Sequence, residues 1–263
     1  MLLDDKVVVI YGASGAIGST VARAFAREGA ILYLSGRHKA PVEALAKEIQ
    51  ADGEFARAAE VDALDEKAID KHLQSVIDKE GRIDVSFNAI GVPGAKILGA
   101  PLVDIDADKF SLAIADYTRS YFLTARLAAR RMIPKKSGVI MTITALPARK
   151  GTRNNGGYGA AQAAKEALTR DLSTELAPQG IRVLSLRPHG ILETSIMREV
   201  FEINAKPAGL TWEQFGGFLA SMTHPRRASL LEEVGNMAVF MASDKASGMT
   251  GTAVNMTLGA LDD

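Results

Sequence analysis

Short apolar runs alternate with stretches of helical periodicity along the whole chain. The first run, Val7-Val8-Val9-Ile10, holds four β-branched residues in a row, which is typical of a strand buried on both faces. The same reading predicts seven strands, at 7–10, 30–35, 55–61, 83–89, 138–144, 181–186 and 253–256. Helices are expected between them at 19–27, 41–51, 65–79, 106–132, 158–177 and 232–242.

Strands that alternate with single helices indicate one α/β fold. We expect a doubly wound parallel sheet of Rossmann type, with about seven strands and helices on both faces. No linker or repeat interrupts the alternation, so residues 1–263 are predicted to form a single dinucleotide-binding domain. Residues 191–225 are expected to be less regular. Ligands of such sheets bind beyond the carboxyl ends of the strands, so the residues just after each strand are the candidates for function.

The stretch after the first strand carries three glycines at a spacing of three, Gly12, Gly15 and Gly18. A strand, a glycine turn and a helix together point backbone N–H groups and the positive end of a helix dipole at a phosphate. The turn is therefore a candidate phosphate site, and glycines that merely close a βα turn are the alternative. The candidate residues are Gly12, Ser14, Gly15, Ala16, Ile17 and Gly18.

The residue after the second strand, Arg37, indicates which dinucleotide would bind. An acidic residue there would bind the 2′-hydroxyl of NAD, whereas an arginine favours the 2′-phosphate of NADP. No Asp or Glu lies between Ser35 and Pro41, and His38 adds possible positive charge, so NADP(H) is expected. A solvated surface arginine is the alternative. Asp62, after the third strand, is a candidate either for the adenine amino group or for capping the following helix.

Composition narrows the class of protein. The 263 residues carry 31 Lys and Arg against 31 Asp and Glu, which argues against a nucleic-acid partner. The absence of cysteine excludes disulfides and makes a zinc site improbable, so no metal is expected. No apolar run is long enough to span a bilayer and no signal peptide fits the first residues, so a cytoplasmic protein without membrane association is predicted.

Four segments in order resemble the short-chain dehydrogenase/reductase family, and the resemblance covers nearly the whole chain. The glycine turn resembles the family's Thr-Gly-x-x-x-Gly-x-Gly, with Tyr11 for Thr and Ala16 for the middle Gly. Asn88 and Ala89 stand where the family has the two asparagines of Asn-Asn-Ala-Gly. The remaining two segments are 176–183, typical of the run before the family's sixth strand, and 240–251, which resembles its C-terminal end.

The resemblance implies a catalytic set of Asn, Ser, Tyr and a Lys four residues after the Tyr, and this chain keeps one of the four. Tyr158 fits the tyrosine, but Gln162 occupies the lysine position. The serine position falls on Ala145, with Thr144 beside it, and Tyr117 stands where the asparagine should be. The predicted catalytic residues are Tyr158, Thr144 as a replacement for the serine, and Gln162 as a hydrogen-bond partner of the ribose.

The missing lysine bears on the direction of the reaction. A tyrosine with an ordinary pKa of about 10 is a poor base at neutral pH, but as a neutral phenol it can still donate a proton. Reduction is therefore easier to support than alcohol oxidation. The resemblance also implies contacts with the cofactor from Asn88, Ala89, Gly91, Tyr158, Pro188, Gly190, Ile191 and Thr194.

The expected function is that of an NADPH-dependent reductase acting on a carbonyl or imine of a small-molecule substrate. Residues 191–225 would form a lid over the substrate, and their apolar side chains suggest a small to medium, apolar substrate; packing in the core is the alternative for them. His189 is either a proton donor or a loop residue. The family resemblance further implies a homodimer or homotetramer.

Two other functions remain open. The loss of the lysine and serine together is compatible with an NADP-binding protein without ordinary redox activity. Alternatively, Lys165 lies seven residues after Tyr158, a spacing that resembles the enoyl-acyl-carrier-protein reductases of this superfamily. An enoyl reductase using Tyr158 and Lys165 is therefore the third hypothesis.

Overall fold

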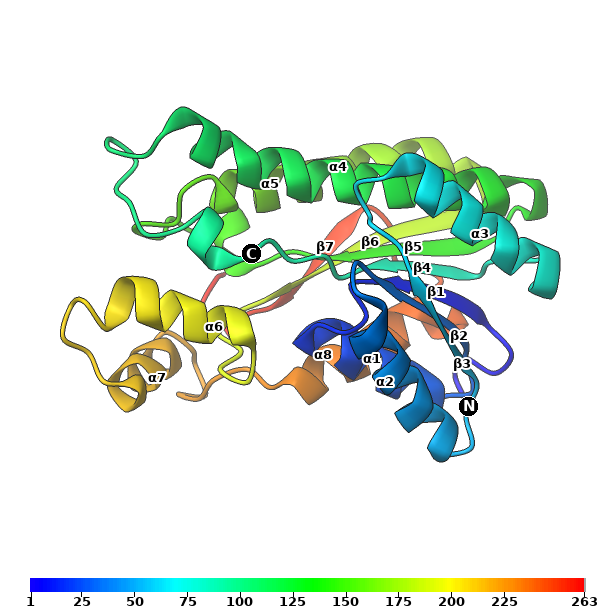
Figure 1. Ribbon diagram of the computed structural model, residues 1–263, viewed down its shortest axis with the longest axis horizontal. Helices are drawn as coiled ribbons and strands as arrows, with labels where there is room; N and C mark the ends of the chain where they lie inside the picture. The colour runs from blue at the N-terminus through cyan, green and yellow to red at the C-terminus, as the bar shows by residue number, and fades with distance from the viewer. Residues whose placement is uncertain (263) are drawn as a thin grey trace.

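The computed structural model describes residues 1–262 and contains a seven-stranded parallel sheet (Figure 1). The order of the strands across the sheet is β3-β2-β1-β4-β5-β6-β7. Their bounds are β1 Val7–Tyr11, β2 Ile31–Gly36, β3 Ala56–Glu60, β4 Val85–Asn88, β5 Gly138–Ile143, β6 Ile181–Pro188 and β7 Thr252–Met256. The α/β fold predicted from the sequence is confirmed.

Helices cover both faces of the sheet. In Figure 1, α3, α4 and α5 lie above it and α1, α2 and α8 lie below it, while α6 and α7 extend at lower left. The bounds are α1 Ala16–Arg27, α2 Lys39–Ala51, α3 Glu66–Glu80, α4 Ala107–Met132, α5 Tyr158–Leu176, α6 Ser195–Val200, α7 Trp212–Ser221 and α8 Leu231–Ala242.

Burial on both faces of β1 explains why its sequence is apolar without alternation. Val8 and Ile10 pack into the core beneath α1, α2 and α8, whereas Val7 and Val9 pack into the core beneath α3, α4 and α5. All four are at most 1% exposed. Each such side chain contributes about 1.5–3 kcal/mol by leaving water, so β1 stabilises both layers at once.

Strand register brings the carboxyl ends of the central strands level with one another. Tyr11 pairs with Asn88, Asn88 with Thr142, and Thr142 with Ser185. From β1 the chain adds β2 and β3 on one side of β1 and then adds β4 on the opposite side of β1. The strand order therefore reverses between β1 and β4. This reversal is the point at which parallel sheets of this kind open a crevice for ligands.

Residues 191–225, expected to be less regular, contain short helical elements joined by loops. They form α6, a π-helical turn at Phe201–Ala205 and α7. Thr194 caps α6, and Thr211 forms a capping box with Gln214 at the start of α7. The segment also has its own apolar cluster, in which Phe201 and Phe215 are buried. Spacing along the chain did not reveal these helices because both are short.

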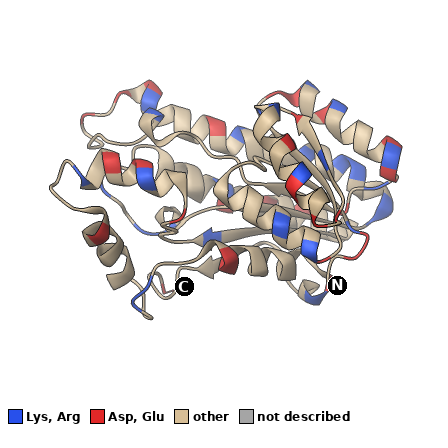
Figure 2. Cartoon of the chain, turned by 60° about the horizontal axis from the view of Figure 1, so that its bottom comes forward, with Lys and Arg blue, Asp and Glu red and all other residues tan. Residues whose placement is uncertain are grey.

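Opposite charges are interspersed over the outer helices (Figure 2). Ion pairs such as Arg23 with Glu48, at 2.6 Å, and Lys39 with Glu43, at 3.1 Å, lie on these exposed surfaces. Pairs of this kind contribute little to stability individually. Within residues 1–262, none of the helices combines the length and apolar character needed to cross a bilayer.

A histidine lies buried under β1 and β2, on the inner side of α3. The His72 ring lies 6.5 Å from the ring of Tyr11 and 6.4 Å from that of Tyr33, and its Nε2 has no hydrogen-bond partner among the described residues. Burial and, to a smaller extent, the nearby charge of Lys79 lower the pKa of His72 to about 4. The neutral imidazole is therefore the form that folding favours.

This pKa predicts how stability depends on pH. Because the pKa of His72 falls from 6.5 to about 4 on folding, its contribution is complete above pH 6.5 and is lost as the pH falls toward 4. Between about pH 7 and about pH 5 the free energy of unfolding of the wild type should fall because of His72. In His72→Phe this fall should be smaller by roughly 2 kcal/mol, measured by urea unfolding at both pH values. The matched control is His38→Phe at an exposed site, which should keep the wild-type pH dependence; equal behaviour of the two variants would contradict the prediction.

Candidate functional site

The glycine turn after β1 is formed by a close approach of two strand ends. Gly12 has a φ of 73°, and a Cβ atom at this position would lie only 2.7 Å from the carbonyl oxygen of Ala89. A Cβ on Gly18 would collide with the carbonyl oxygen of Gly12. Two of the three glycines are therefore required by the backbone itself, Gly12 also by its conformation.

The N-terminus of α1 is left open by this turn. Gly15 is the N-cap, it offers no side-chain cap, and no acidic residue lies in the first turn. The N–H groups of Ala16, Ile17 and Gly18 have no partner within an α-helix. Ser14 and Gly15 are exposed beside them. These donors fit the phosphates of a dinucleotide, because an anion would satisfy the N–H groups and the helix dipole together.

The end of β2 lies beside the turn. Ser14 Oγ is 3.7 Å from the place of a Cβ on Gly36. Arg37 and His38 follow Gly36 and are exposed, and the Arg37 guanidinium forms no hydrogen bond or ion pair within residues 1–262. Both side chains are therefore free to meet an anion at this edge.

Asp62 and Asn88 both have local partners. Asp62 is exposed, and its Oδ1 accepts from the Leu64 backbone N–H at 3.0 Å, which closes the turn before α3. Asn88 is buried: its Nδ2 donates to Thr124 Oγ1 at 3.0 Å and its Oδ1 accepts from the Ile90 N–H. Asn88 thus shapes the loop that contains Ala89 and the exposed Gly91.

The segment after β6 lies at the same carboxyl edge of the sheet as the glycine turn. Pro188 ends the strand, and Gly190 turns the chain with a φ of 61°. Ile191 is buried, and its carbonyl accepts from Thr194 Oγ1 at 2.8 Å. The same hydroxyl accepts from Met197 N at 3.4 Å and so caps α6. His189 is half-buried, its Nε2 lacks a partner, and burial lowers its pKa to about 4.

Two tyrosines stand together at the start of α5. The rings of Tyr158 and Tyr117 are 5.5 Å apart and meet edge to face. The Tyr117 hydroxyl accepts from the Val92 backbone N–H at 3.1 Å, whereas the Tyr158 hydroxyl has no hydrogen bond within the described residues. Burial raises the pKa of Tyr158 above its ordinary value, and Tyr117 raises it further. Tyr158 is therefore protonated at neutral pH.

Gln162 lies one turn after Tyr158 on α5, and its side-chain amide oxygen is unpaired among the described residues. It is 2% exposed, and its Oε1 has no partner among the described residues. An unpaired buried amide oxygen costs free energy unless a ligand or a water donates to it. Gln162 therefore fits a ligand that carries a hydroxyl, such as the ribose of a nicotinamide nucleotide.

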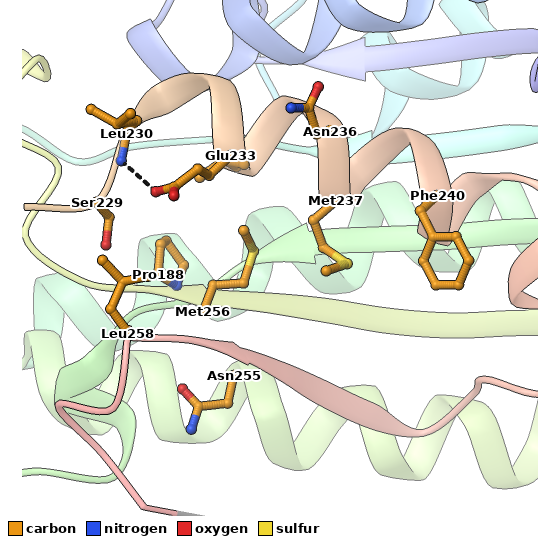
Figure 3. A pocket seen from close by; sticks show the side chains of 11 residues that line it. Pro188, Ser229, Leu230, Glu233, Asn236, Met237, Phe240, Asn255, Met256 and Leu258 are labelled. Atoms are coloured by element: carbon orange, nitrogen blue, oxygen red, sulfur yellow. Dashed lines mark hydrogen bonds between the residues drawn. The ribbon is translucent and has the colours of Figure 1, made fainter. Parts of the chain in front are cut away.

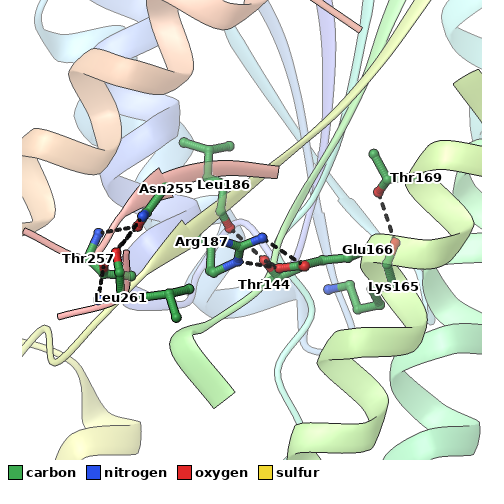
Figure 4. A network of polar contacts seen from close by, with 9 residues as sticks. All are labelled: Thr144, Lys165, Glu166, Thr169, Leu186, Arg187, Asn255, Thr257 and Leu261. Atoms are coloured by element: carbon green, nitrogen blue, oxygen red, sulfur yellow. Dashed lines mark hydrogen bonds and ion pairs between the residues drawn. The ribbon is translucent and has the colours of Figure 1, made fainter. Parts of the chain in front are cut away.

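Thr144, Glu166 and Arg187 form a buried polar network (Figure 4). Arg187 and Glu166 make a two-pronged ion pair at 2.7 and 2.9 Å, and both side chains are at most 3% exposed. Thr144 Oγ1 is 3.1 Å from both Glu166 Oε1 and the Leu186 carbonyl oxygen, so its one hydrogen is shared between them. In this arrangement the Thr144 hydroxyl has no hydrogen left for a substrate oxygen.

Lys165 is wholly buried next to this network and has no counter-ion within residues 1–262. Its Nζ donates to the Ile143 carbonyl at 2.6 Å and lies 5.6 and 5.8 Å from the ring centres of Tyr117 and Tyr121. Burial lowers the pKa of Lys165 to about 7. Lys165 thus contacts Tyr117, which in turn contacts Tyr158.

Sequence reasoning missed the roles of Glu166 and Arg187. A signal was present, since Gln162, Lys165, Glu166 and Thr169 share the helical face that begins with Ala161 and turns inward. Charged residues on such a face need partners in the interior. Which strand supplies the partner is decided only by the packing of α5 on β5 and β6.

A separate cavity of about 450 Å³ lies between α8 and β7, with Met237 and Phe240 on one side and Met256 on the other (Figure 3). Of the predicted site residues only Pro188 touches it. No group of three or more His, Cys, Asp or Glu side chains able to hold a metal ion occurs in the part of the chain that the structure describes.

The chain is similar to proteins of known sequence and structure. A family model described as enoyl-(acyl carrier protein) reductase matches residues 12–260. The chain belongs to the short-chain dehydrogenase/reductase family. The 7α-hydroxysteroid dehydrogenase of Escherichia coli K12 is 28% identical over 99% of this chain and 96% of its own length.

Two solved structures of this fold are also similar. Sorbitol-6-phosphate 2-dehydrogenase from Erwinia amylovora is 26% identical with a TM-score of 0.90, covering 97% of this chain and 100% of the other. An NAD⁺-bound xylitol dehydrogenase is 27% identical with a TM-score of 0.88, covering 97% and 99%. This short-chain dehydrogenase/reductase is accordingly an oxidoreductase.

The buried lysine predicts a gain in stability on its removal. The pKa of Lys165 falls from 10.5 to about 7 on folding, so the charged form opposes folding at and below neutral pH, and stability rises as the pH increases from 7 toward 10.5. Lys165→Met should therefore raise the free energy of unfolding at about pH 7 by roughly 1–4 kcal/mol, measured with urea. Exposed Lys67→Met is the control and should change it little; destabilisation by Lys165→Met would show that the bond to Ile143 outweighs the burial of charge.

Proposed function

We propose that this protein is an NADPH-dependent reductase that adds a hydride to a carbonyl or imine carbon, with Tyr158 as the proton donor to a carbonyl oxygen. The observation that carries the proposal is the Tyr158 hydroxyl, which is protonated and forms no hydrogen bond with described residues. A protonated phenol supports reduction, because the alkoxide formed by hydride addition is a far stronger base than the phenolate.

The cofactor would lie across the glycine turn. NADPH supplies the hydride when bound. The open N–H groups of Ala16 to Gly18 would hold its phosphates, and the Oε1 of Gln162 would accept from its ribose. Asn88 and Thr194 would act by holding their loops in shape. Asp62 remains available to the adenine through its second carboxylate oxygen.

The preference for NADP rests on Arg37. Family membership does not decide it, since the related xylitol dehydrogenase binds NAD⁺. In this chain an exposed arginine without a partner follows β2, and no acid stands between residues 35 and 41 to bind a 2′-hydroxyl. The guanidinium would bind the 2′-phosphate with charge-assisted hydrogen bonds.

The substrate would lie against an apolar wall, formed by the side chains that pack around Tyr158. Tyr158 packs with Val92, Ile97 and Leu98 from the loop after β4. The same cluster includes Val200 and Ile203 from the predicted lid at 191–225. This lining supports a small to medium, apolar substrate. We assign Thr144 to holding Glu166 and Arg187 in place.

Enoyl reduction is the second candidate, supported by the description of the matching family model. Lys165 would then act through Tyr117, because its Nζ is bonded to the Ile143 carbonyl. NADPH binding without any NADPH oxidation across carbonyl and enoyl substrates would instead favour a non-redox protein.

A cytoplasmic homodimer or homotetramer, associating through the outer faces of α4 and α5, completes the proposal.

Removal of the Tyr158 hydroxyl tests the proton donor. Tyr158→Phe should lower kcat for a neutral ketone by about 100-fold or more, because the oxygen then lacks its proton source, while the Kd for NADPH stays within about twofold. Tyr33→Phe removes a tyrosine hydroxyl bonded to Glu80 on α3 and is the control. Unchanged ketone turnover in Tyr158→Phe would remove Tyr158 from the mechanism.

Charge reversal at Arg37 tests the cofactor. Arg37→Asp should weaken NADPH binding by about 10–100-fold, the value of one or two lost charge-assisted hydrogen bonds, and should improve NADH binding. Kd values from nucleotide fluorescence measure both. Lys47→Asp, an exposed change on α2, should alter neither. A wild-type protein that binds NADH as tightly as NADPH would contradict the assignment.

A further inference from the structure

A carboxylate from α6 reaches the loop that follows β4. Glu199 Oε2 accepts from the backbone N–H of Gly94 at 2.6 Å. Gly94 starts a short 3₁₀ turn, Gly94–Lys96, and a Cβ at its position would lie 3.0 Å from the same carboxylate oxygen and 3.2 Å from Ile196. A side chain at Gly94 would therefore be in tight contact with this carboxylate.

Apolar side chains flank Glu199 on its segment. The next residue, Val200, and Ile203 one turn later pack into the cluster that contains Tyr117 and Tyr158. A half-buried carboxylate therefore stands at the edge of the wall that we assign to the substrate. Charge at such an edge is less screened than on an open surface.

No cation among residues 1–262 neutralises this carboxylate. Glu199 forms no ion pair within residues 1–262, and no hydrogen bond to its Oε1 is formed there. Its neighbour Arg198 points to Trp212, with the guanidinium carbon 3.5 Å from the ring centre. Burial raises the pKa of Tyr117, and the hydrogen bond from Val92 opposes this rise. The negative charge of Glu199 adds to the rise, so it acts on the Tyr117 hydroxyl.

We infer that Glu199 selects a cationic substrate, and that the preferred substrate of the proposed reductase is a protonated imine. The reduction step in this inference rests on the proposed function, whereas the preference for a cation rests on Glu199. The free Oε1 can accept from an N–H⁺ group, and the apolar wall can cover the hydrocarbon part. A carboxylate without a counter-ion at the edge of an apolar site is satisfied best by a cation.

The reaction balances without a proton from the protein. The iminium carbon accepts a hydride from the reduced nicotinamide, the C=N π pair moves onto nitrogen, and a neutral amine and the oxidised nicotinamide result. The iminium is reduced by two electrons and the nicotinamide is oxidised by two. Tyr158, whose raised pKa makes it a weak acid, would be needed for a ketone but not for an iminium ion.

A matched pair of substrates tests the inference. Purified full-length protein with NADPH is given the cyclic imine pyrroline or its neutral counterpart cyclopentanone, and NADPH oxidation is followed by absorbance. We expect Glu199→Gln to lower the ratio of kcat/KM for imine over ketone by about tenfold or more. Glu202→Gln is the control, because Glu202 is exposed and paired with Lys206 on the same segment, and should leave the ratio unchanged.

A binding measurement separates this inference from the proposed function. Trp212 is the only tryptophan of the chain and stacks on Arg198, the residue before Glu199, so its fluorescence is the probe with which we would follow ligand binding. Pyrrolidinium should bind at least about tenfold more tightly than cyclopentanol in the wild type, and this advantage should vanish in Glu199→Gln.

Equal binding of the cation and the alcohol would overturn the inference, whatever the activity. Reduction of the ketone but not of the imine would also overturn it and would leave the proposed function standing. Failure to reduce either compound, with Glu199-dependent binding of pyrrolidinium, would instead overturn the reductase and retain the cation site.

Discussion

The contact between the end of β1 and the end of β4 is the constraint on which the site depends. The backbone of Gly12 lies so close to the Ala89 carbonyl that no side chain fits, and its φ of 73° suits glycine. This approach keeps the carboxyl ends of the central strands level and turns the chain directly into α1. The open N–H groups of α1 and the loop after Asn88 therefore lie at the same edge of the sheet.

The other half of the site depends on polar groups that α5 carries into the interior. Lys165 bonds the end of β5 at Ile143, and Glu166 bonds Thr144 and Arg187 at the ends of β5 and β6. Buried charges oppose folding unless they are paired, and here Glu166 is paired while Lys165 is not. The helix that presents Tyr158 is thereby joined to the sheet edge by hydrogen bonds as well as by apolar packing.

The segment 191–225 reaches the loop after β4 from a third direction. Its helices hold together through their own aromatic cluster of Phe201, Trp212 and Phe215, and only the Glu199 side of α6 reaches the loop after β4. The apolar residues of this segment thus fall into two groups. Phe201 and Phe215 pack within the segment, whereas Val200 and Ile203 cover Tyr158.

The sequence alone determined the architecture and the place of the glycine turn, because apolar periodicity and glycine spacing are local properties that each strand and helix carries by itself. It also predicted Tyr158 and Gln162 as site residues through the family resemblance, and Arg37 by its position after the second strand. Only the tertiary structure decided that the Thr144 hydroxyl is bonded to Glu166 and that Glu199 meets Gly94. These partners lie 22 and 105 residues apart in the chain, and no local pattern encodes which distant groups the packing of α5 and α6 brings together.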